Sequence, residues 1–244
     1  MTSTVDFSIV APAFVTGLVV LASHVPLGRR VLERGIVFLD LAVAQLAATG
    51  AVAVRLLEVE NPWIVQLAAL TTALVGAFAL YGCEQRWPKV QEAVIGATFV
   101  VSASLVMLLL AGSPHGGEHL QDVLAGQILW VTWNQVVLAT AASAAVLLVW
   151  WTLRDRLGGA LFYGLFAIAV TLSVQLVGVY LVFASLILPA LVATRRGLAV
   201  GYLAGAAGYG LGLGASAVLD LPAGPSVVCA LALASVALGL RLRA

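Results

Sequence analysis

Residues Ala160–Thr194 read ALFYGLFAIAVTLSVQLVGVYLVFASLILPALVAT, and this stretch decides the fold of the chain. Arg154-Asp155-Arg156 precedes it and Arg195-Arg196 follows it. Membrane proteins retain Lys and Arg in their cytoplasmic loops, so both ends of this apolar stretch are expected on the same side of a membrane. An even number of crossings must therefore fit between them.

Two arrangements of this stretch satisfy that requirement. Two short helices that meet at Gly178 would do so, and so would one helix followed by a broken or re-entrant helix that ends near Pro189. Short paired segments interrupted by Gly or Pro are typical of the core of a transporter. An ordinary tight helical hairpin is the alternative interpretation.

The basic residues elsewhere in the chain follow the same alternation. Eleven of the twelve Lys and Arg residues fall in alternate gaps between apolar runs: Arg29, Arg30, Arg34, Arg86, Lys89, Arg154, Arg156, Arg195, Arg196, Arg241 and Arg243. Only Arg55 falls in a gap of the other parity. The pattern predicts that these gaps lie inside, that the N-terminus lies outside and that the C-terminus is cytoplasmic.

Composition supports a membrane protein of one transmembrane domain that spans residues 1–244. The chain is 62% hydrophobic and 9% charged, with a mean hydropathy of +1.10, whereas soluble domains carry about 25% charged residues. The scattered basic residues form no patch, so no nucleic-acid partner is expected. The fold class is therefore an all-α polytopic membrane protein with eight or nine helices, the lower count applying if the short first segment lies at the membrane interface.

The apolar runs predict nine helices, each about the length that a bilayer requires. They are Ile9–Val25, Val31–Val54, Trp63–Gly82, Ala93–Gly112, Gln135–Leu153, Ala160–Val177, Val179–Thr194, Ala199–Leu219 and Ala223–Leu240.

Asp40 is the one ionisable residue well inside an apolar run. An aspartate at mid-membrane costs roughly 2.5–3.5 kcal/mol on insertion scales, so a cavity, a partner or an ion pathway is expected beside it. On a continuous helix it would lie about 9 Å from Arg34, in the inner third of the membrane. An ion or metal contact is one interpretation, and a structural pair with Arg34 is the other. Gln45 could line the same pathway or form an interhelical hydrogen bond, and His24 is expected at the membrane interface.

The predicted external loop 113–126 holds a second candidate metal site. His115, Glu118, His119 and Asp122 are spaced i, i+3, i+4 and i+7, so a helix would place them on one face. Two imidazoles and two carboxylates suit zinc or manganese. A solvated polar loop is the alternative interpretation.

The chain lacks the nucleotide-binding pattern G-x-x-x-x-G-K-[ST]. It is therefore expected to be no enzyme, and ATP-driven transport would need a separate ATPase subunit.

Several segments, in order, resemble the ABC-3 family of metal-ion permeases. VGVYLVFASLILPALVAT (Val177–Thr194) resembles the family's signature run, with a Gly, a small residue and a Pro. PLGRRVLERGIVFLDLAVAQLAATGA, EAVIG, HLQDVLAGQILWVTW and DLPAGPSVV resemble its first loop and acidic helix, a later helix start, an external segment and the last hairpin.

The resemblance implies the permease subunit of an ATP-binding-cassette importer of the type II kind, in a bacterial cytoplasmic membrane. Such permeases form homodimers, pair with two cytosolic ATPases and receive Zn, Mn or Fe from an extracytoplasmic metal-binding protein. The divalent metal ion is cargo, and no permanently bound cofactor is expected. Metal is expected to pass along the dimer interface, lined in part by the second helix.

The resemblance also assigns candidate roles to residues. Gly178, Ser185 and Pro189 become candidate gate or hinge residues, and Glu84, Arg86, Glu92, Arg154, Asp155 and Arg156 become candidates for coupling to the ATPase. The family commonly has Asp and His four residues apart on the second helix. Here the position four after Asp40 is Ala44, and an alignment on the later Gly places Gln45 at the His position.

Two other functional classes remain open on the sequence. One is a permease for a metal chelate or a cobalamin-like substrate, which would normally be longer. The other is an ATP-independent secondary transporter, which would not co-purify with an ATPase.

Overall fold

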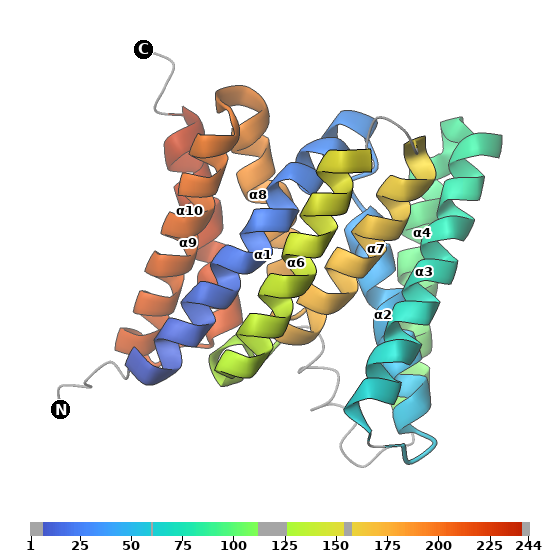
Figure 1. Ribbon diagram of the computed structural model, residues 1–244, viewed down its shortest axis with the longest axis horizontal. Coiled ribbons are helices and arrows are strands. Elements are labelled where there is room, and N and C mark those ends of the chain that lie inside the picture. Colours follow the sequence, from blue (N-terminus) through green and yellow to red (C-terminus); the bar gives the residue numbers. More distant parts are fainter. Residues whose placement is uncertain (1–6, 60, 112–125, 154–157, 241–244) are drawn as a thin grey trace.

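The computed structural model describes residues 7–59, 61–111, 126–153 and 158–240, and within them it contains nine α-helices (Figure 1). The helices are α1 (Phe7–Arg34), α2 (Leu39–Arg55), α3 (Pro62–Arg86), α4 (Gln91–Leu110), α6 (Trp133–Leu153), α7 (Gly158–Val177), α8 (Val179–Arg196), α9 (Leu198–Leu219) and α10 (Ala223–Leu240). Two short 3₁₀ turns, η1 (Pro88–Val90) and η2 (Ile128–Trp130), precede α4 and α6.

Seven of these helices are long and apolar enough to cross a membrane, α10 is a shorter apolar helix, and α2 has only 17 residues. The all-α polytopic class is confirmed. The first segment is not a short interfacial piece, because α1 has 28 residues and runs the full height of the bundle (Figure 1).

The basic gaps that fall within the described residues lie together at one end of the bundle. The C-terminal ends of α1, α3, α6 and α8 all point to the upper end in Figure 1, whereas the connections from α2 to α3 and from α9 to α10 lie at the lower end. Arg34, Arg86, Arg195 and Arg196 therefore share the upper end, which we call the basic end. The alternation in the sequence is thus an alternation in space.

The predicted break at residues 26–30 is wrong, because α1 continues to Arg34. Pro26 lies inside α1 and has no backbone N–H to give to the carbonyl of Ala22. The hydroxyl of Tyr202, from α9, donates to that carbonyl at 3.0 Å instead. The chain turns later, at Gly35, whose φ of +71° ends the helix before α2 begins at Leu39.

The stretch from Ala160 to Thr194 forms two complete helices, so the re-entrant alternative is wrong. Gly178 separates α7 from α8 with φ +82° and ψ 163°, a conformation that is accessible essentially only to glycine. Pro189 lies within α8 and does not end it. Both ends of the hairpin lie at the basic end, as the flanking arginines predict.

The core of the bundle lies where α1, α2, α7 and α8 meet. Buried apolar side chains from these four helices form most of the main cluster. α2 packs against α3, α4, α7 and α8, and ten of its 17 residues are buried. α6 is much more exposed and lies at the periphery. The second helix, which carries Asp40, is therefore enclosed by protein.

Candidate functional site

Asp40 lies in the first turn of α2 and is completely buried. Neither of its carboxylate oxygens has a hydrogen-bond partner among the described residues. Burying a carboxylate without a partner is costly, so this side chain is poised to interact with a cation or with a proton.

Arg34 does not pair with Asp40. The turn at residues 35–38 interrupts the continuous helix on which the expected separation of the two residues was based. The guanidinium of Arg34 instead faces the carboxylate of Glu84, on α3, with Nη1 and Oε2 3.6 Å apart. Asp40 is thus left without the neutralising arginine that the sequence suggested.

The turn before Asp40 is attached to α4. The backbone N–H of Phe38 donates to the carboxylate of Glu92 at 3.3 Å, and the N–H of Leu39 donates to the carbonyl of Ile36 at 3.1 Å. These contacts fix where α2 begins, and with it the height of Asp40 in the bundle.

Six side chains from four helices form one group at the basic end, which we call the Arg34 cluster: Arg34, Tyr81, Glu84, Gln91, Phe162 and Tyr163. Arg34 Cζ lies 4.8 Å from the centre of the Phe162 ring, a cation–π contact. The side-chain amide of Gln91 donates to the hydroxyl of Tyr163, whose ring packs against Tyr81 with centroids 5.6 Å apart. The cluster therefore joins the start of α7 to the ends of α1 and α3 and the start of α4.

The faces of α2 can be assigned from its contacts. Leu46 and Gly50 pack on α3, and Thr49 faces α4, where its hydroxyl lies 3.5 Å from the carbonyl of Ser102. Asp40, Ala44, Ala47 and Ala51 follow the i, i+4, i+7, i+11 spacing and form a separate stripe. This stripe of small residues is left for the contacts that α2 makes with α7 and α8.

The other predicted metal-site residues fall in two groups. Gln45 is 3% exposed. It directly follows Ala44 in the sequence, so it lies on a different face of α2 from the stripe that contains Asp40. His115, Glu118, His119 and Asp122 lie outside the described residues. The described part of the chain contains no group of three or more His, Cys, Asp or Glu residues that could hold a metal ion.

His24 was expected at the membrane interface, but it is completely buried in the middle of α1. Its Nδ1 lies 3.2 Å from the hydroxyl of Ser23, and within the described residues its Nε2 has no hydrogen-bond partner. The error follows from the misplaced helix end, because a helix that continues to Arg34 carries residue 24 into the bundle.

The predicted gate residues occupy the α7–α8 hairpin. The hydroxyl of Ser185 is 2.8 Å from that of Tyr209, on α9, and both side chains are completely buried. Gly178 forms the corner and Pro189 lies one turn beyond Ser185. The three residues thus follow one line along α8, from the corner toward the basic end.

One protein-family model matches nearly the whole chain. The ABC 3 transport family matches residues 6–160 and 154–240. The chain belongs to this family. It is an ABC-3 permease, the membrane subunit of an ABC transporter. None of the curated proteins matches its sequence.

Two solved structures share the fold of this ABC-3 permease. PsaBC from Streptococcus pneumoniae, solved in complex with Fab, is 20% identical with a TM-score of 0.78, and the match covers 98% of this chain and 93% of that chain. An inward-facing ABC transporter described as being of the metal-chelate type is 15% identical with a TM-score of 0.55, covering 94% and 75%. At these identities the likeness establishes the arrangement of helices.

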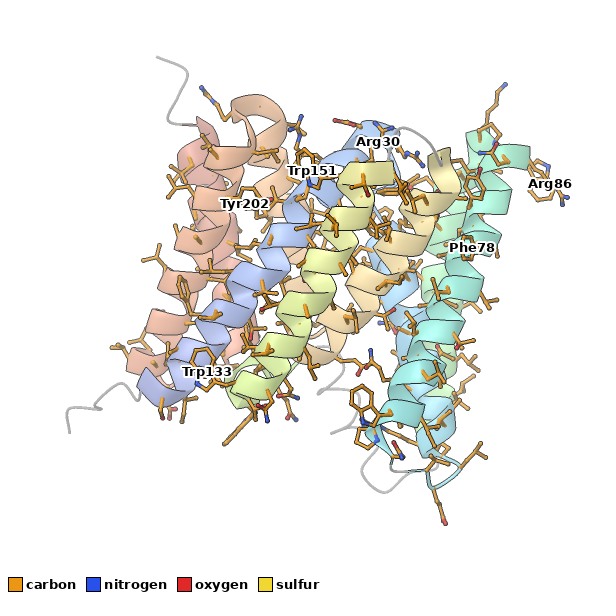
Figure 2. The ribbon with its side chains drawn as sticks, viewed as in Figure 1. Arg30, Phe78, Arg86, Trp133, Trp151 and Tyr202 are labelled. Atoms are coloured by element: carbon orange, nitrogen blue, oxygen red, sulfur yellow. The ribbon has the colours of Figure 1, made fainter. Side chains whose placement is uncertain are left out.

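The residues proposed to couple this permease to an ATPase occupy different settings. Arg86 is exposed at the end of α3 and points away from the bundle (Figure 2). Glu84 and Glu92 make the intramolecular contacts described above. Arg154, Asp155 and Arg156 lie outside the described residues, directly before α7.

Proposed function

We propose that this permease imports a divalent transition metal ion, Zn, Mn or Fe, by alternating access driven by separate ATPase subunits. The observation that carries the proposal is Asp40, a completely buried carboxylate with two unpartnered oxygens on an enclosed helix. Carboxylate oxygens are ligands for these cations, and an intramembrane acid is by default a candidate for an ion pathway.

The burial of Asp40 also bears on the mechanism. Because α2 packs against α3, α4, α7 and α8, an ion reaches Asp40 when these helices separate. We infer that the α7–α8 hairpin moves against the stripe of small residues on α2 (Asp40, Ala44, Ala47 and Ala51). This movement would expose Asp40 to one side of the membrane at a time. The 115–122 segment would capture the ion on the opposite side of the membrane from the ATPase.

The assembly proposed for this permease is a homodimer with two cytosolic ATP-binding-cassette ATPases and an extracytoplasmic metal-binding protein. The basic end would be cytoplasmic, in a bacterial cytoplasmic membrane, because positive loops are retained inside. Labelling of the variant Arg195→Cys by an impermeant maleimide, in a background lacking Cys83 and Cys229, checks this orientation: intact cells should protect the thiol.

The test is metal accumulation in cells that express this chain with its ATPase. We expect uptake of one of the three metals to depend on the chain and to fall by roughly tenfold or more in Asp40→Asn, equivalent to about 1.4 kcal/mol or more. Glu58→Gln, which changes an exposed carboxylate at the other end, is the matched control and should retain uptake. Unchanged accumulation of all three metals on removal of the chain would exclude the proposal.

A metal chelate is the second candidate cargo, because one of the two similar structures is described as being of that type. The buried, unpartnered carboxylate of Asp40 favours the bare ion, because carboxylate oxygens can bind such a cation directly. Uptake that requires an added chelator, and that Asp40→Asn leaves intact, would favour the chelate.

A further inference from the structure

A cleft of about 300 Å³ opens at the basic end between α1, α6 and the start of α9. This volume is at the lower limit of small-molecule sites. Its lining residues are Pro26, Arg29, Arg30, Glu33, Trp150, Trp151 and Leu198. Figure 2 shows Arg30 and Trp151 close together at the upper end of α1 and α6.

The charged side chains of this cleft are incompletely satisfied. Glu33 contacts both arginines, at 3.0 Å from Arg30 and 4.0 Å from Arg29, and all three side chains are one-third to one-half exposed. Exposed pairs of this kind contribute little free energy, so a stronger anion can replace Glu33. Two arginines against one glutamate leave a net charge of 2 − 1 = +1, and Arg29 Nε is buried with no hydrogen-bond partner in the described structure.

The aromatic and apolar side chains of the cleft match the membrane interface. Trp150 is held edge-on against Phe162, with ring centroids 5.8 Å apart, while Trp151 is half exposed. Tryptophan is enriched at the level of the lipid headgroups. Leu148, one turn below Trp151 on the peripheral helix α6, is 66% exposed and offers apolar surface to an acyl chain.

We propose that this cleft binds the phosphate headgroup of an anionic lipid from the leaflet at the basic end. The guanidinium groups of Arg29 and Arg30 would hold the phosphate oxygens, for which their geometry is suited. Basic pockets between transmembrane helices are a recognised form of lipid site. An acidic segment of the ATPase is the rival occupant; the tryptophans and the exposed face of α6 favour lipid. The proposal does not depend on which cargo is transported.

The experiment uses the full chain, purified with any ATPase that remains bound, and native mass spectrometry in the presence of phosphatidylglycerol. We expect retention of about one lipid per chain and a loss of roughly tenfold in apparent affinity for R29Q/R30Q, equivalent to about 1.4 kcal/mol. R195Q/R196Q is the matched control, because it removes an arginine pair at the same end outside the cleft. Inorganic phosphate at the same concentration should not displace the lipid, since it lacks the acyl chains.

A second variant keeps the proposal falsifiable if R29Q/R30Q fails to fold. Glu33→Gln retains both arginines and raises the net charge of the cleft from +1 to +2, so it should increase lipid retention. Equal retention in R29Q/R30Q and R195Q/R196Q, or no increase for Glu33→Gln, would overturn the proposal. Loss of the ATPase from R29Q/R30Q with unchanged lipid would assign the cleft to the ATPase.

Discussion

At the scale of single residues, the fold depends on hydrogen bonds that replace missing ones. Pro26 removes a donor from the middle of α1, and Tyr202 supplies a donor to the carbonyl of Ala22 from another helix. Because lipid offers no water to an unpaired carbonyl, this substitution allows a proline to remain inside a membrane helix.

This exchange predicts a coupling between residues 26 and 202. Tyr202→Phe should destabilise the permease by about 0.6–1.7 kcal/mol, the range of interhelical hydrogen bonds in membranes. In the Pro26→Ala background the same substitution should cost less, because the restored N–H can donate to Ala22. Reversible denaturation in mixed detergent micelles measures both costs. Equal costs in the two backgrounds would show that the Tyr202 contact does not compensate for the proline.

Single residues also show what a sequence can and cannot reveal. Asp40 could be singled out because an acid in an apolar run is visible locally. The contacts near Asp40 could not be predicted in the same way, because they join residues that are distant in the sequence. Arg34 and Glu84 are 50 positions apart, and Gln91 and Tyr163 are 72 positions apart. No local pattern connects residues so distant, so the pairing of Arg34 with Glu84 rather than Asp40 required the three-dimensional arrangement.

At the scale of elements, the α7–α8 hairpin was predictable and the first helix was not. Flanking arginines and Gly178 mark the hairpin at both its ends and its corner. In α1, the sequence pattern of Pro26, Gly28 and the arginines that follow is typical of a loop. The chain nevertheless remains helical to Arg34. The helix is stabilised here because α8 and α9 pack against this segment. Such tertiary contacts cannot be read from the local sequence.

The corner of the hairpin predicts a specific sensitivity to substitution. Gly178→Ala should destabilise the permease by about 1–3 kcal/mol, because a side chain is strained at φ +82° and ψ 163°. Gly214→Ala is the matched control: Gly214 is helical in α9, and nothing lies within 4 Å of an added Cβ. It should be neutral or stabilise by up to about 1 kcal/mol. Thermal unfolding in detergent compares the two variants, and similar midpoints would contradict the assignment of strain to the corner.

At the scale of the whole molecule, the Arg34 cluster lies between the two functional ends of the proposed mechanism. α7 begins at Gly158, two residues after Arg154, Asp155 and Arg156, which are candidates for coupling to the ATPase. Phe162 and Tyr163, in its first two turns, belong to the Arg34 cluster, and Arg34 immediately precedes the turn that leads to Asp40. We therefore expect a displacement of α7 to reach the start of α2 through these side chains in contact.

Arg34→Gln should consequently separate ATP hydrolysis from transport. It removes the charge that faces Glu84 and Phe162, so we expect ATPase activity to persist while metal uptake per ATP falls by roughly threefold to tenfold, or about 0.7–1.4 kcal/mol of coupling. Arg55→Gln, at the other end of α2, is the control and should leave the ratio unchanged. Proteoliposomes that report both rates provide the measurement. A parallel loss of both rates would indicate that Arg34 serves stability alone.

The corner at Gly178 also bears on how such a chain can change over evolutionary time. α7 leaves the basic end and α8 returns to it. The pair therefore crosses the membrane twice, and the chain continues on the side from which it started. Insertion or loss of such a pair changes the helix count by two and keeps every flanking loop on its own side of the membrane. Permeases can therefore differ in helix number while presenting the same loops to the same compartment.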